Sequence, residues 1–308
     1  MNAWNTEDSL LKVLDATEFV RLPITPRKYL LAPWLYDGAL IMIHAQTGVG
    51  KTHLTLNIAH ALATAGEFLG WRADSPVSVL YVDGEMAKDD LQGRLKAINA
   101  RTGVEPAKGN LRLLARSTQV DGYMPNLFSE EGQGLFNEHF KPADVIIIDN
   151  LSSLVSGSNE NEAEGWEPIQ GWAVKQRTQG KTIIFVHHAG KNGTQRGTSK
   201  RTDLMDVVIK LERKDDYIQE EGAHFRVVFE KARSLYGASV APFEAKLSEH
   251  VSGVQVWERI AGGNDAEALE MLAMEEQGLS QPQIAEKIGV HKSTVSRTLK
   301  RLKAQRAA

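Results

Sequence analysis

The segment ALIMIHAQTGVGKT, residues 39–52, decides the fold of this chain. Its opening stretch, ALIMIH, is a nearly continuous apolar run, which is typical of a strand covered on both faces. A glycine-rich turn follows, and residues 54–63 have the pattern of a helix. In this order a strand, a glycine-rich loop and a helix place main-chain N–H groups and the positive end of the helix around an anion. The segment therefore predicts a phosphate-binding site in an α/β domain.

The residue types of the loop match the Walker A pattern, with Ala45 in place of its first glycine. Glycine allows the backbone to turn its N–H groups inward. A lysine supplies a positive charge for the β- and γ-phosphates, and a threonine hydroxyl is a hard oxygen ligand for Mg²⁺. We therefore predict ATP and Mg²⁺ as ligands, with nucleotide contacts from Thr47, Gly48, Val49, Gly50, Lys51 and Thr52.

Strand and helix patterns alternate farther along the chain. The apolar runs that predict buried strands are VSVLYVD (77–83), LRLLA (111–115), VIIID (145–149) and TIIFVH (182–187), and a charged helix is predicted at 89–100. Such alternation predicts a mainly parallel sheet with right-handed crossovers. Two later runs predict adjacent antiparallel strands, DVVIKLER (206–213) and HFRVVFEKAR (224–233). Upstream, a helix at 9–19 and a Pro-punctuated connector predict an N-terminal arm that packs on the core or reaches a neighbouring subunit.

Charged side chains follow the predicted strands, at the edge where an open α/β sheet binds ligands. Asp149 occupies the Walker B position, from which a carboxylate holds Mg²⁺ through water. Glu85 follows the second strand and can deprotonate the attacking water, with Asp83 as the competing candidate. Either His187 or His188 can contact the γ-phosphate. Adjacent strand residues point to opposite faces, so we do not expect the two histidines to share a metal ion.

Five motifs occur in order along the chain: AQTGVGKT (45–52), YVDGEM (81–86), VIIIDNLSSL (145–154), FVHHAGK (185–191) and FEKARSLYG (229–237). This set resembles the RecA-like ATPases of the hexameric RepA helicase type, which are encoded by plasmids and mobile elements and are related to the DnaB helicases. The resemblance covers residues 30–258. It implies that Glu85 is the catalytic glutamate and that His188 senses the γ-phosphate. It also implies that Lys231 and Arg233 reach the nucleotide of a neighbouring subunit, with Arg233 as an arginine finger.

Two polar stretches follow the Walker B strand and the histidines, at 152–166 and 189–201. Both are candidates for loops that face a central channel. The second is rich in glycine and in bases, which suits a phosphate backbone without base preference. An ordinary surface loop would have the same composition. The candidate DNA contacts in this stretch are Lys191, Arg196, Lys200 and Arg201.

The segment LSQPQIAEKIGVHKSTVSRTLKRLKAQ, residues 279–305, predicts a helix-turn-helix. Ser280 caps the first helix with Gln283, the small Ala285 allows the two helices to approach, and Gly289 makes the turn. The second helix has a buried stripe formed by Val295, Leu299 and Leu302. Its other face suits the major groove, with candidate DNA contacts Lys292, Ser293, Thr294, Arg297, Lys300 and Arg301. The alternative is a helical hairpin that contacts proteins.

The charge of the chain is distributed unevenly. The 308 residues have a net charge of −3, yet residues 287–308 contain seven bases and no acid. A basic end on an acidic body is a common layout for nucleic-acid binding. The absence of cysteine excludes disulfides and thiolate metal sites. We predict an arm at 1–38, a RecA-like core at 39–261 and, after the break at Gly262 and Gly263 with a helix start at Asn264, a helix-turn-helix domain at 264–308.

These features predict an ATP-hydrolysing motor that acts on DNA, as a hexameric RepA-type helicase of plasmid or phage replication. ATP sites would lie at the subunit interfaces of a homo-oligomeric ring. The N-terminus has no pattern of a secretory signal and no apolar run approaches the roughly 20 residues that span a bilayer, so we expect a cytoplasmic protein without a membrane partner. Two alternatives remain: a nucleotide-switched DNA-binding regulator or partition factor, and a filament-forming recombination or repair ATPase.

Overall fold

A computed structural model of the chain describes residues 12–155, 166–189, 200–213, 222–249, 254–261 and 263–306. The main sheet has nine strands in the order β13-β12-β11-β10-β3-β9-β8-β6-β7. In chain order these are β3 (Leu40–Ala45), β6 (Val79–Asp83), β7 (Leu111–Ala115), β8 (Val145–Asp149), β9 (Thr182–His188), β10 (Val207–Arg213), β11 (His224–Ala232), β12 (Phe243–Glu249) and β13 (Gln255–Ala261). Two small hairpins pair β1 (Tyr29–Leu31) with β2 (Leu35–Tyr36), and β4 (Glu67–Phe68) with β5 (Trp71–Arg72).

The sheet combines a parallel part with an antiparallel extension. Strands β10, β3, β9, β8, β6 and β7 pair in parallel, whereas β11, β12 and β13 continue the sheet from β10 in antiparallel pairs. The register aligns Ala45 with His188, and Asp83 with Asp149. The carboxyl ends of the parallel strands therefore meet at one edge of the sheet. The predicted alternation and the antiparallel pair β10–β11 are confirmed.

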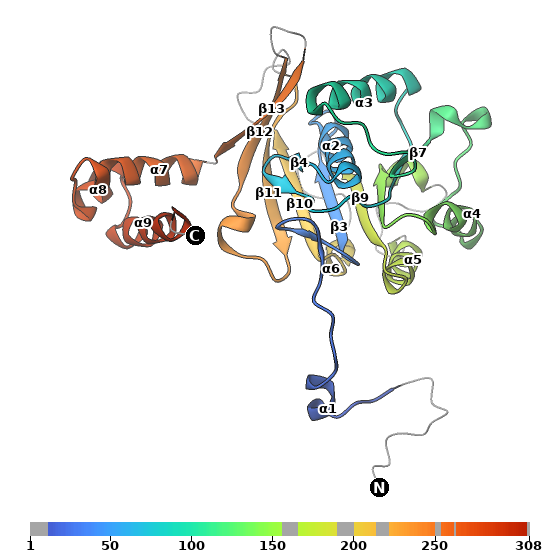
Figure 1. Ribbon diagram of the computed structural model, residues 1–308, viewed down its shortest axis with the longest axis horizontal. Helices are drawn as coiled ribbons and strands as arrows, with labels where there is room; N and C mark the ends of the chain where they lie inside the picture. Colours follow the sequence, from blue (N-terminus) through green and yellow to red (C-terminus); the bar gives the residue numbers. More distant parts are fainter. Residues whose placement is uncertain are drawn as a thin grey trace.

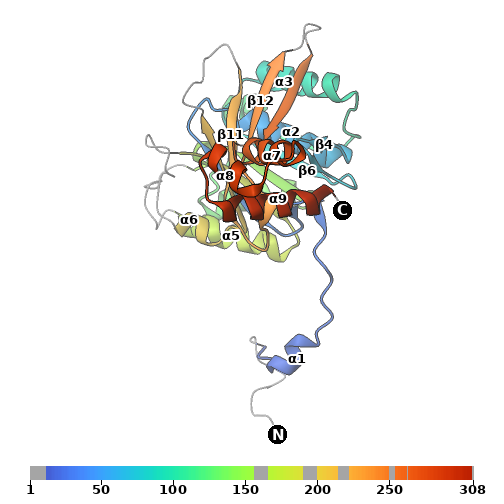
Figure 2. The ribbon, with the colours of Figure 1, turned by 90° about the vertical axis from the view of Figure 1, so that its left-hand side faces the viewer.

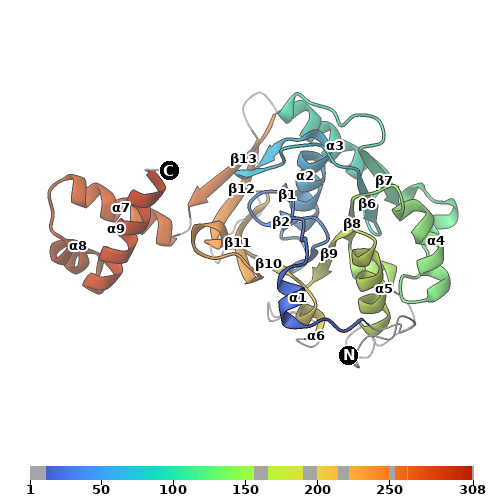
Figure 3. The same cartoon turned by 60° about the horizontal axis from the view of Figure 1, so that its bottom comes forward.

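Helices cover both faces of the sheet, as Figures 1 and 3 show. The helices of the core are α2 (Lys51–Thr64), α3 (Lys88–Thr102), α4 (Glu130–Phe140), α5 (Glu167–Thr178) and α6 (Lys200–Asp203). Helices α2 and α3, with the two hairpins, lie on one face, and α4 and α5 lie on the other. The strands are buried on both faces, which accounts for their continuous apolar runs.

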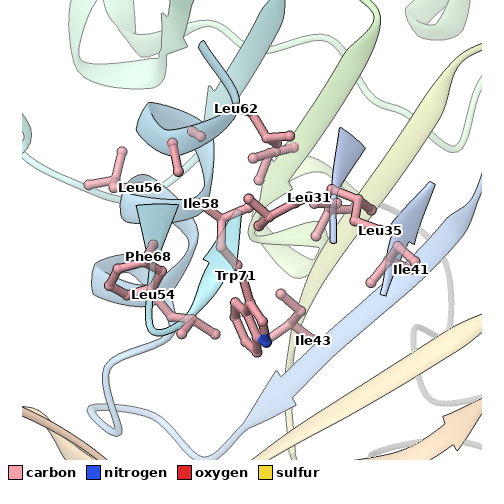
Figure 4. Packing of buried hydrophobic residues seen from close by; sticks show 14 of the residues in the cluster. Leu31, Leu35, Ile41, Ile43, Leu54, Leu56, Ile58, Leu62, Phe68 and Trp71 are labelled. Atoms are coloured by element: carbon pink, nitrogen blue, oxygen red, sulfur yellow. The ribbon is translucent and has the colours of Figure 1, made fainter. Parts of the chain in front are cut away.

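Two hydrophobic clusters pack against the two faces. Figure 4 shows part of the first, which includes Leu54 and Ile58 of α2 and Ile41 and Ile43 of β3, with the ring of Trp71 between Leu54 and Ile43. Trp71 of the hairpin β4–β5 closes this cluster, with its ring in edge contact with that of Trp34 at 5.2 Å between centroids. The second cluster joins the strand residues that face the other way to the aromatic rings of α4 and α5. The two clusters together fix the positions of the parallel strands, and hence of the residues at their carboxyl ends.

The N-terminal segment differs from the prediction in the extent of its helix. The described helix α1 is Ala16–Val20, capped by Asp15, and residues 12–15 are not helical. Residues 9–11 of the predicted helix lie outside the described residues. The hairpin β1–β2 belongs to the predicted arm at 1–38 and packs on the core, one of the two alternatives predicted for that arm, because Leu31 and Leu35 are buried in the first cluster. The apolar run YLLAPWLY draws this segment into the core, so the chain joins the core at Tyr29. Figure 1 shows α1 well away from the body.

Three helices follow the sheet: α7 (Gly263–Glu276), α8 (Gln281–Ile288) and α9 (Lys292–Arg306). They share a small cluster of their own, formed by Met271, Leu272, Ile284, Ala285, Val295 and Leu299. Figure 2 shows the three helices in front of the sheet, with α9 crossing beneath α7. Helix α7 begins at Gly263, so Asn264 lies inside the helix rather than at its cap. The predicted features of α8 and α9 are confirmed: a capping box at Ser280, a left-handed Gly289 and a partly buried Leu302 beside the stripe.

Candidate nucleotide-binding site

The loop between β3 and α2 has the backbone that an anion cradle requires. Gly48 and Gly50 adopt positive φ angles of 77° and 118°, where only glycine is free of steric cost. A side chain at Gly50 would also approach Phe225 of β11 to 2.8 Å. Helix α2 begins directly afterwards, at Lys51, so its N-terminal N–H groups face the same space.

Lys51 lies inside this cradle. Its Nζ donates to the carbonyl oxygens of Ala45 and Gln46, both at 3.1 Å, and lies 3.0 Å from His188 Nδ1. Burial lowers the pKa of the ammonium, against the opposing effect of the Asp149 and Glu85 carboxylates. The ammonium is thus held at the bottom of the cradle, where a phosphate can exchange with these neutral acceptors.

Asp149 ends β8 and is buried beside the start of α2. Its Oδ2 accepts a hydrogen bond from Tyr81 Oη at 2.6 Å, and its carboxylate is also hydrogen-bonded to Thr52. Burial raises the pKa of Asp149, while the hydrogen bonds from Tyr81 and Thr52 oppose this rise. A buried carboxylate next to a threonine hydroxyl is a hard-oxygen donor pair, which fits Mg²⁺ held between the protein and phosphate oxygens. Among the described residues, no three His, Asp or Glu side chains gather around a separate metal site.

The structure separates the roles of the two acids after β6. Asp83 is buried and its Oδ1 accepts from the main-chain N–H groups of Glu85, at 3.2 Å, and Met86, at 2.8 Å. Burial raises the pKa of Asp83 to about 6. Asp83 therefore shapes the turn, whereas the half-exposed Glu85 faces the pocket with its Oε1 at 3.6 Å from His188 Nε2.

The two histidines at the end of β9 point to opposite faces, as predicted. His188 joins the pocket: beyond Lys51, its Nδ1 lies 3.3 Å from Thr47 Oγ1 and its Nε2 lies 2.7 Å from Asn150 Nδ2. His187 is buried on the other face, with its Nε2 at 2.7 Å from Arg201 Nη1. His188 can thus connect a phosphate to the segment that follows the Walker B strand.

The phosphate loop and the acids and histidine that face it line one cavity of about 360 Å³. It brings together Lys51, Thr52, Glu85, Asp149 and His188 from four separate segments. Sequence reasoning missed other lining residues: His53 and Asn150, which directly follow Thr52 and Asp149, and three that no motif marks, Arg94, Gly222 and Ala223. Arg94 comes from the charged helix α3, and the loop before β11 supplies Gly222 and Ala223. Their presence here depends on tertiary packing alone.

Lys231 and Arg233 lie at the other edge of the sheet. Strand β11 runs antiparallel to β10, so its last residues pair with the first residues of β10. Lys231 Nζ donates to the carbonyl oxygens of Thr202 and Asp203, and Arg233 Nη2 donates to that of Asp203 at 2.8 Å. About five strand residues, or roughly 16 Å, separate this edge from the cradle. These two side chains are therefore not part of the cavity of their own chain.

The candidate DNA contacts of the second loop are largely untested by the structure. Lys191 and Arg196 lie outside the described residues, as do residues 156–165 of the first loop and the side chain of Lys200. The structure corrects the prediction for Arg201. Only 3% of this residue is exposed, because α6 packs it against His187 and the ring of Trp166. In this conformation its guanidinium does not face solvent and does not present a phosphate contact.

The candidate DNA contacts on α9 form an accessible face. Lys292, Ser293, Arg297 and Lys300 are exposed, and Thr294 is partly exposed. The side chain of Arg301 lies outside the described part of the helix. Arg297 and Lys300 lie opposite the buried Val295 and Leu299, as the helical period requires, whereas Lys292 is exposed as the first residue of the helix. Helix α9 thus packs its apolar face against α7 and α8 and leaves its polar face exposed.

The fold and the cavity define a class of protein. The strand order β10-β3-β9-β8-β6, the phosphate cradle after β3 and the acid after β8 are those of a RecA-like P-loop ATPase core with a mostly parallel sheet, followed by a helical region of the helix-turn-helix type. The chain belongs to the family described as an AAA domain, whose model matches residues 6–194. A second model, described as a homeodomain-like domain, matches residues 264–308.

Relatives and structures similar to the chain were also found. It is 26% identical over 182 residues to a DNA repair protein RadA of Campylobacter jejuni, and 23% identical over 182 residues to one of Mycobacterium tuberculosis. These matches cover 58% of this chain but 34% and 32% of those proteins, so the chain spans about a third of the length of the curated relatives it matches.

Two solved structures are similar at 16% identity. The flagellar accessory protein FlaH of Methanocaldococcus jannaschii has a TM-score of 0.49 and covers 72% of this chain and 90% of its own. A KaiC-like protein of Pyrococcus horikoshii OT3 has a TM-score of 0.48, with 74% and 93% covered. Within the described residues, none of the helices combines the length and apolar character that crossing a bilayer requires.

Proposed function

We propose that this protein is an ATP-hydrolysing motor that acts on DNA, assembled as a hexameric ring and related in activity to RepA-type helicases of plasmid or phage replication. The observation that carries the proposal is the gathering of Lys51, Thr52, Asp149, Glu85 and His188 around one cavity at the edge of a parallel sheet. Within one chain, this set supplies the groups that phosphoryl transfer to water needs, except a further positive charge that stabilises the transition state.

In this proposal each residue has a distinct task. The main-chain N–H groups of residues 47–52 and the Lys51 ammonium hold the phosphates of ATP. Thr52 and Asp149 hold Mg²⁺, which neutralises charge on the phosphate oxygens when bound. Glu85, half exposed above the cradle, accepts the proton of the attacking water. His188 reports the γ-phosphate through its contact with Asn150.

The proposal places Lys231 and Arg233 in the nucleotide site of an adjacent subunit. Their position at the far edge of the sheet supports this, because a side chain there does not line the cavity of its own chain. The Arg233 side chain is about half exposed, with 51% of its surface accessible, so its guanidinium is available to a neighbour. Arginine supplied in this way stabilises the charge of the transition state.

The DNA partner is supported by three observations. The face of α9 is exposed and basic, and the matching family model is of a homeodomain-like domain. The RadA relatives are DNA repair proteins by name. We propose that residues 264–308 form a separate domain that recruits the ring to duplex DNA through Lys292, Ser293, Thr294, Arg297, Lys300 and Arg301. Single-stranded DNA would then contact the loops at 152–166 and 189–201.

The test is ATP turnover without DNA, with single-stranded DNA and with duplex DNA, alongside the mass of the protein in solution. We expect a hexamer and a turnover that rises with single-stranded DNA. Lys51→Ala should abolish turnover, whereas the exposed Lys96→Ala should not change it. Turnover that persists in Lys51→Ala would remove the motor and every mechanism built on this cavity.

The second candidate is a nucleotide-switched DNA-binding regulator, favoured by the anchored helix-turn-helix geometry of α8 and α9. In this case ATP would control assembly, and binding to a specific duplex site would be the output. Strand displacement on a forked duplex separates the two candidates. Site-specific duplex binding without displacement would favour the regulator. Filaments in electron microscopy would favour the third possibility, a recombination or repair ATPase.

A further inference from the structure

Three main-chain carbonyl groups converge on the side chain of Arg116. This residue begins the 3₁₀ turn η1 (Arg116–Thr118), directly after the edge strand β7. Its Nε donates to the carbonyl oxygen of Gly84 at 2.8 Å, its Nη1 to that of Gly122 at 3.2 Å and its Nη2 to that of Ser153 at 2.5 Å. The rigid, planar guanidinium suits several acceptors at once, which an ammonium group does not match. One side chain therefore ties together three segments that are distant in sequence.

The first of these acceptors belongs to the peptide group that leads into Glu85. The carbonyl of Gly84 and the N–H of Glu85 are the two polar ends of the same planar unit. Arg116 holds the carbonyl, and Asp83 Oδ1 accepts from the N–H at 3.2 Å. The orientation of this peptide plane is thus determined at both ends. The Cα atom of Glu85 belongs to the same planar unit, so its position is fixed together with the plane.

Glu85 has little else to orient it. The Glu85 side chain is 53% exposed, so packing does not restrict it closely. Its Oε1 lies 3.6 Å from His188 Nε2, which is longer than a hydrogen bond. The direction in which the carboxylate leaves the chain is consequently set by the backbone that Arg116 and Asp83 hold.

The third acceptor belongs to the segment after the Walker B strand, the turn η3 (Leu151–Leu154). This turn is in close contact with Gly84: a Cβ at Gly84 would lie 1.8 Å from Ser153 Oγ. Ser153 N in turn donates to Asn150 Oδ1 at 3.1 Å, and Asn150 Nδ2 lies 2.7 Å from His188 Nε2. Arg116 therefore closes a ring of contacts that runs from Glu85 through η3 to the histidine at the phosphate.

We propose that Arg116 is a positioning residue for ATP hydrolysis: it orients Glu85 and links it to the turn that follows the Walker B strand. The inference rests on the proposed role of Glu85 as the base. Arg116 does not line the phosphate cavity, so it acts on turnover and not on nucleotide affinity. A misplacement of about 1 Å in a catalytic group costs on the order of a hundredfold in rate.

The first test compares Arg116→Ala and Arg116→Lys with Arg112→Ala. Arg112 lies on β7, the strand that ends just before Arg116, and donates to a carbonyl away from the site, that of His139 at 3.3 Å. We expect Arg116→Ala to lower kcat about 10- to 100-fold, with the KM for ATP and the Kd for a fluorescent ADP analogue changed less than about threefold. Arg116→Lys should recover part of kcat, because an ammonium can reach one or two of the three carbonyls. Arg112→Ala should behave as the unaltered protein.

Arg116→Lys also serves if Arg116→Ala does not fold, as judged by circular dichroism and thermal unfolding. A folded Arg116→Ala with kcat within about twofold of the unaltered protein would overturn the proposal, as would such a value in Arg116→Lys where that is the only variant that folds. A loss of nucleotide affinity in proportion to the loss of kcat would do so as well, since a general disturbance of the site moves both.

The second test adds Arg116→Ala to Glu85→Gln. If Arg116 acts through Glu85, the double variant should turn over no more slowly than Glu85→Gln alone, because the carboxylate that Arg116 positions is already gone. If Arg116→Ala lowers the turnover of Glu85→Gln by the same factor as it lowers that of the unaltered protein, the proposal is overturned. Full turnover in Glu85→Gln alone is a different outcome: it would remove the proposed role of Glu85 whatever the Arg116 variants show.

Discussion

A chain of hydroxyl groups supports the acid of the Walker B strand. Thr55 Oγ1 lies 2.8 Å from Tyr81 Oη, which donates to Asp149 Oδ2. Thr55 also donates to the carbonyl oxygen of Lys51, so the chain begins in the first turn of α2. Tyr81 thereby occupies one oxygen of Asp149 and fixes the direction of the other. Groups that orient a ligand in this way commonly affect metal affinity as much as they affect structure.

Tyr81→Phe tests this support. The change removes one oxygen from a buried position and keeps the ring in place, so we expect the fold to be retained. Without the donor, Asp149 is less well oriented, and the Mg²⁺ concentration for half-maximal ATP turnover should rise about tenfold. The measurement is a Mg²⁺ titration of turnover, with the exposed Tyr123→Phe as control. Identical Mg²⁺ curves for the two variants would show that the hydroxyl has no such role.

Residue types alone predicted much of the cavity. Gly48, Gly50, Lys51 and Thr52 are adjacent in the sequence, and their spacing is itself the signal. Asp149 could be placed because the end of a buried strand is recognisable. In contrast, Arg116 meets Gly84 and Ser153 across 32 and 37 residues, and no local pattern marks such an encounter.

The helix α4 illustrates packing at the scale of an element. Ser129 Oγ caps it by accepting from Gly132 N at 3.1 Å. The chain turns back so closely before the helix that a Cβ at Gly132 would lie 2.0 Å from the carbonyl oxygen of Asn126. Two residues farther on, Gly134 has nothing within 4 Å of its Cβ position. Glycine is thus required at position 132, whereas position 134 of the same helix has room for a side chain.

Alanine substitutions at the two glycines should therefore have opposite effects. Gly132→Ala forces the backbone at Asn126 to move and should lower the free energy of unfolding by about 1–3 kcal/mol. Gly134→Ala removes a flexible residue from a helix and should raise it by about 0.5–1 kcal/mol. Urea denaturation of both variants measures the difference. A destabilised Gly134→Ala, or a Gly132→Ala as stable as the unaltered protein, would contradict this account of α4.

The predictability of the other elements depends on their length and composition. The strands β3, β8 and β9 were predicted because continuous β-branched runs are typical of strands buried on both faces. The hairpins β1–β2 and β4–β5 were not, since strands of two or three residues have no period to detect. Strand β12 (FEAKLSE) does alternate apolar and polar residues and could have been found from this signal, whereas β13 (QVWERIA) has no such alternation; both extend the sheet from β11. Arg201 has the sequence context of a loop cation, and only the packing of α6 buries it.

At the scale of the whole molecule, three histidines link folding to pH. Burial lowers the pKa of His44 and His60, and lowers that of His53 to about 4. Between pH 6.5 and pH 4 the unfolded chain therefore binds protons that the folded chain does not, and the free energy of unfolding falls as the pH falls. Asp83 has the opposite effect below pH 6, because the folded chain holds its proton more tightly. Asp149 acts in the same direction as Asp83, because burial raises its pKa as well, so the two carboxylates oppose the effect of the three histidines.

His60→Gln should weaken this pH dependence. His60 Nε2 contacts the carbonyl oxygen of Val104 at 3.0 Å, and a glutamine amide can still donate there. The variant removes one group that the unfolded chain protonates, so its free energy of unfolding should fall less steeply between pH 7.5 and pH 5.5. Urea denaturation across this range checks it, with the exposed His139→Gln as control. Equal slopes for the two variants would exclude His60 as a contributor.

The placement of Lys51 and Arg233 at opposite edges of one sheet leads to the last prediction. If each site combines the cradle of one subunit with the arginine of the next, Arg233→Ala should abolish turnover and leave ATP binding nearly intact. Lys51→Ala should also be inactive, for the opposite reason. When the two variants are mixed, however, a Lys51→Ala subunit can supply its intact Arg233 to the intact cradle of an Arg233→Ala subunit. Random assembly then makes about one interface in four competent, and turnover should return to about a quarter of that of the unaltered protein. A mixture as inactive as its components, despite proven exchange of subunits, would show that the two residues do not meet across an interface.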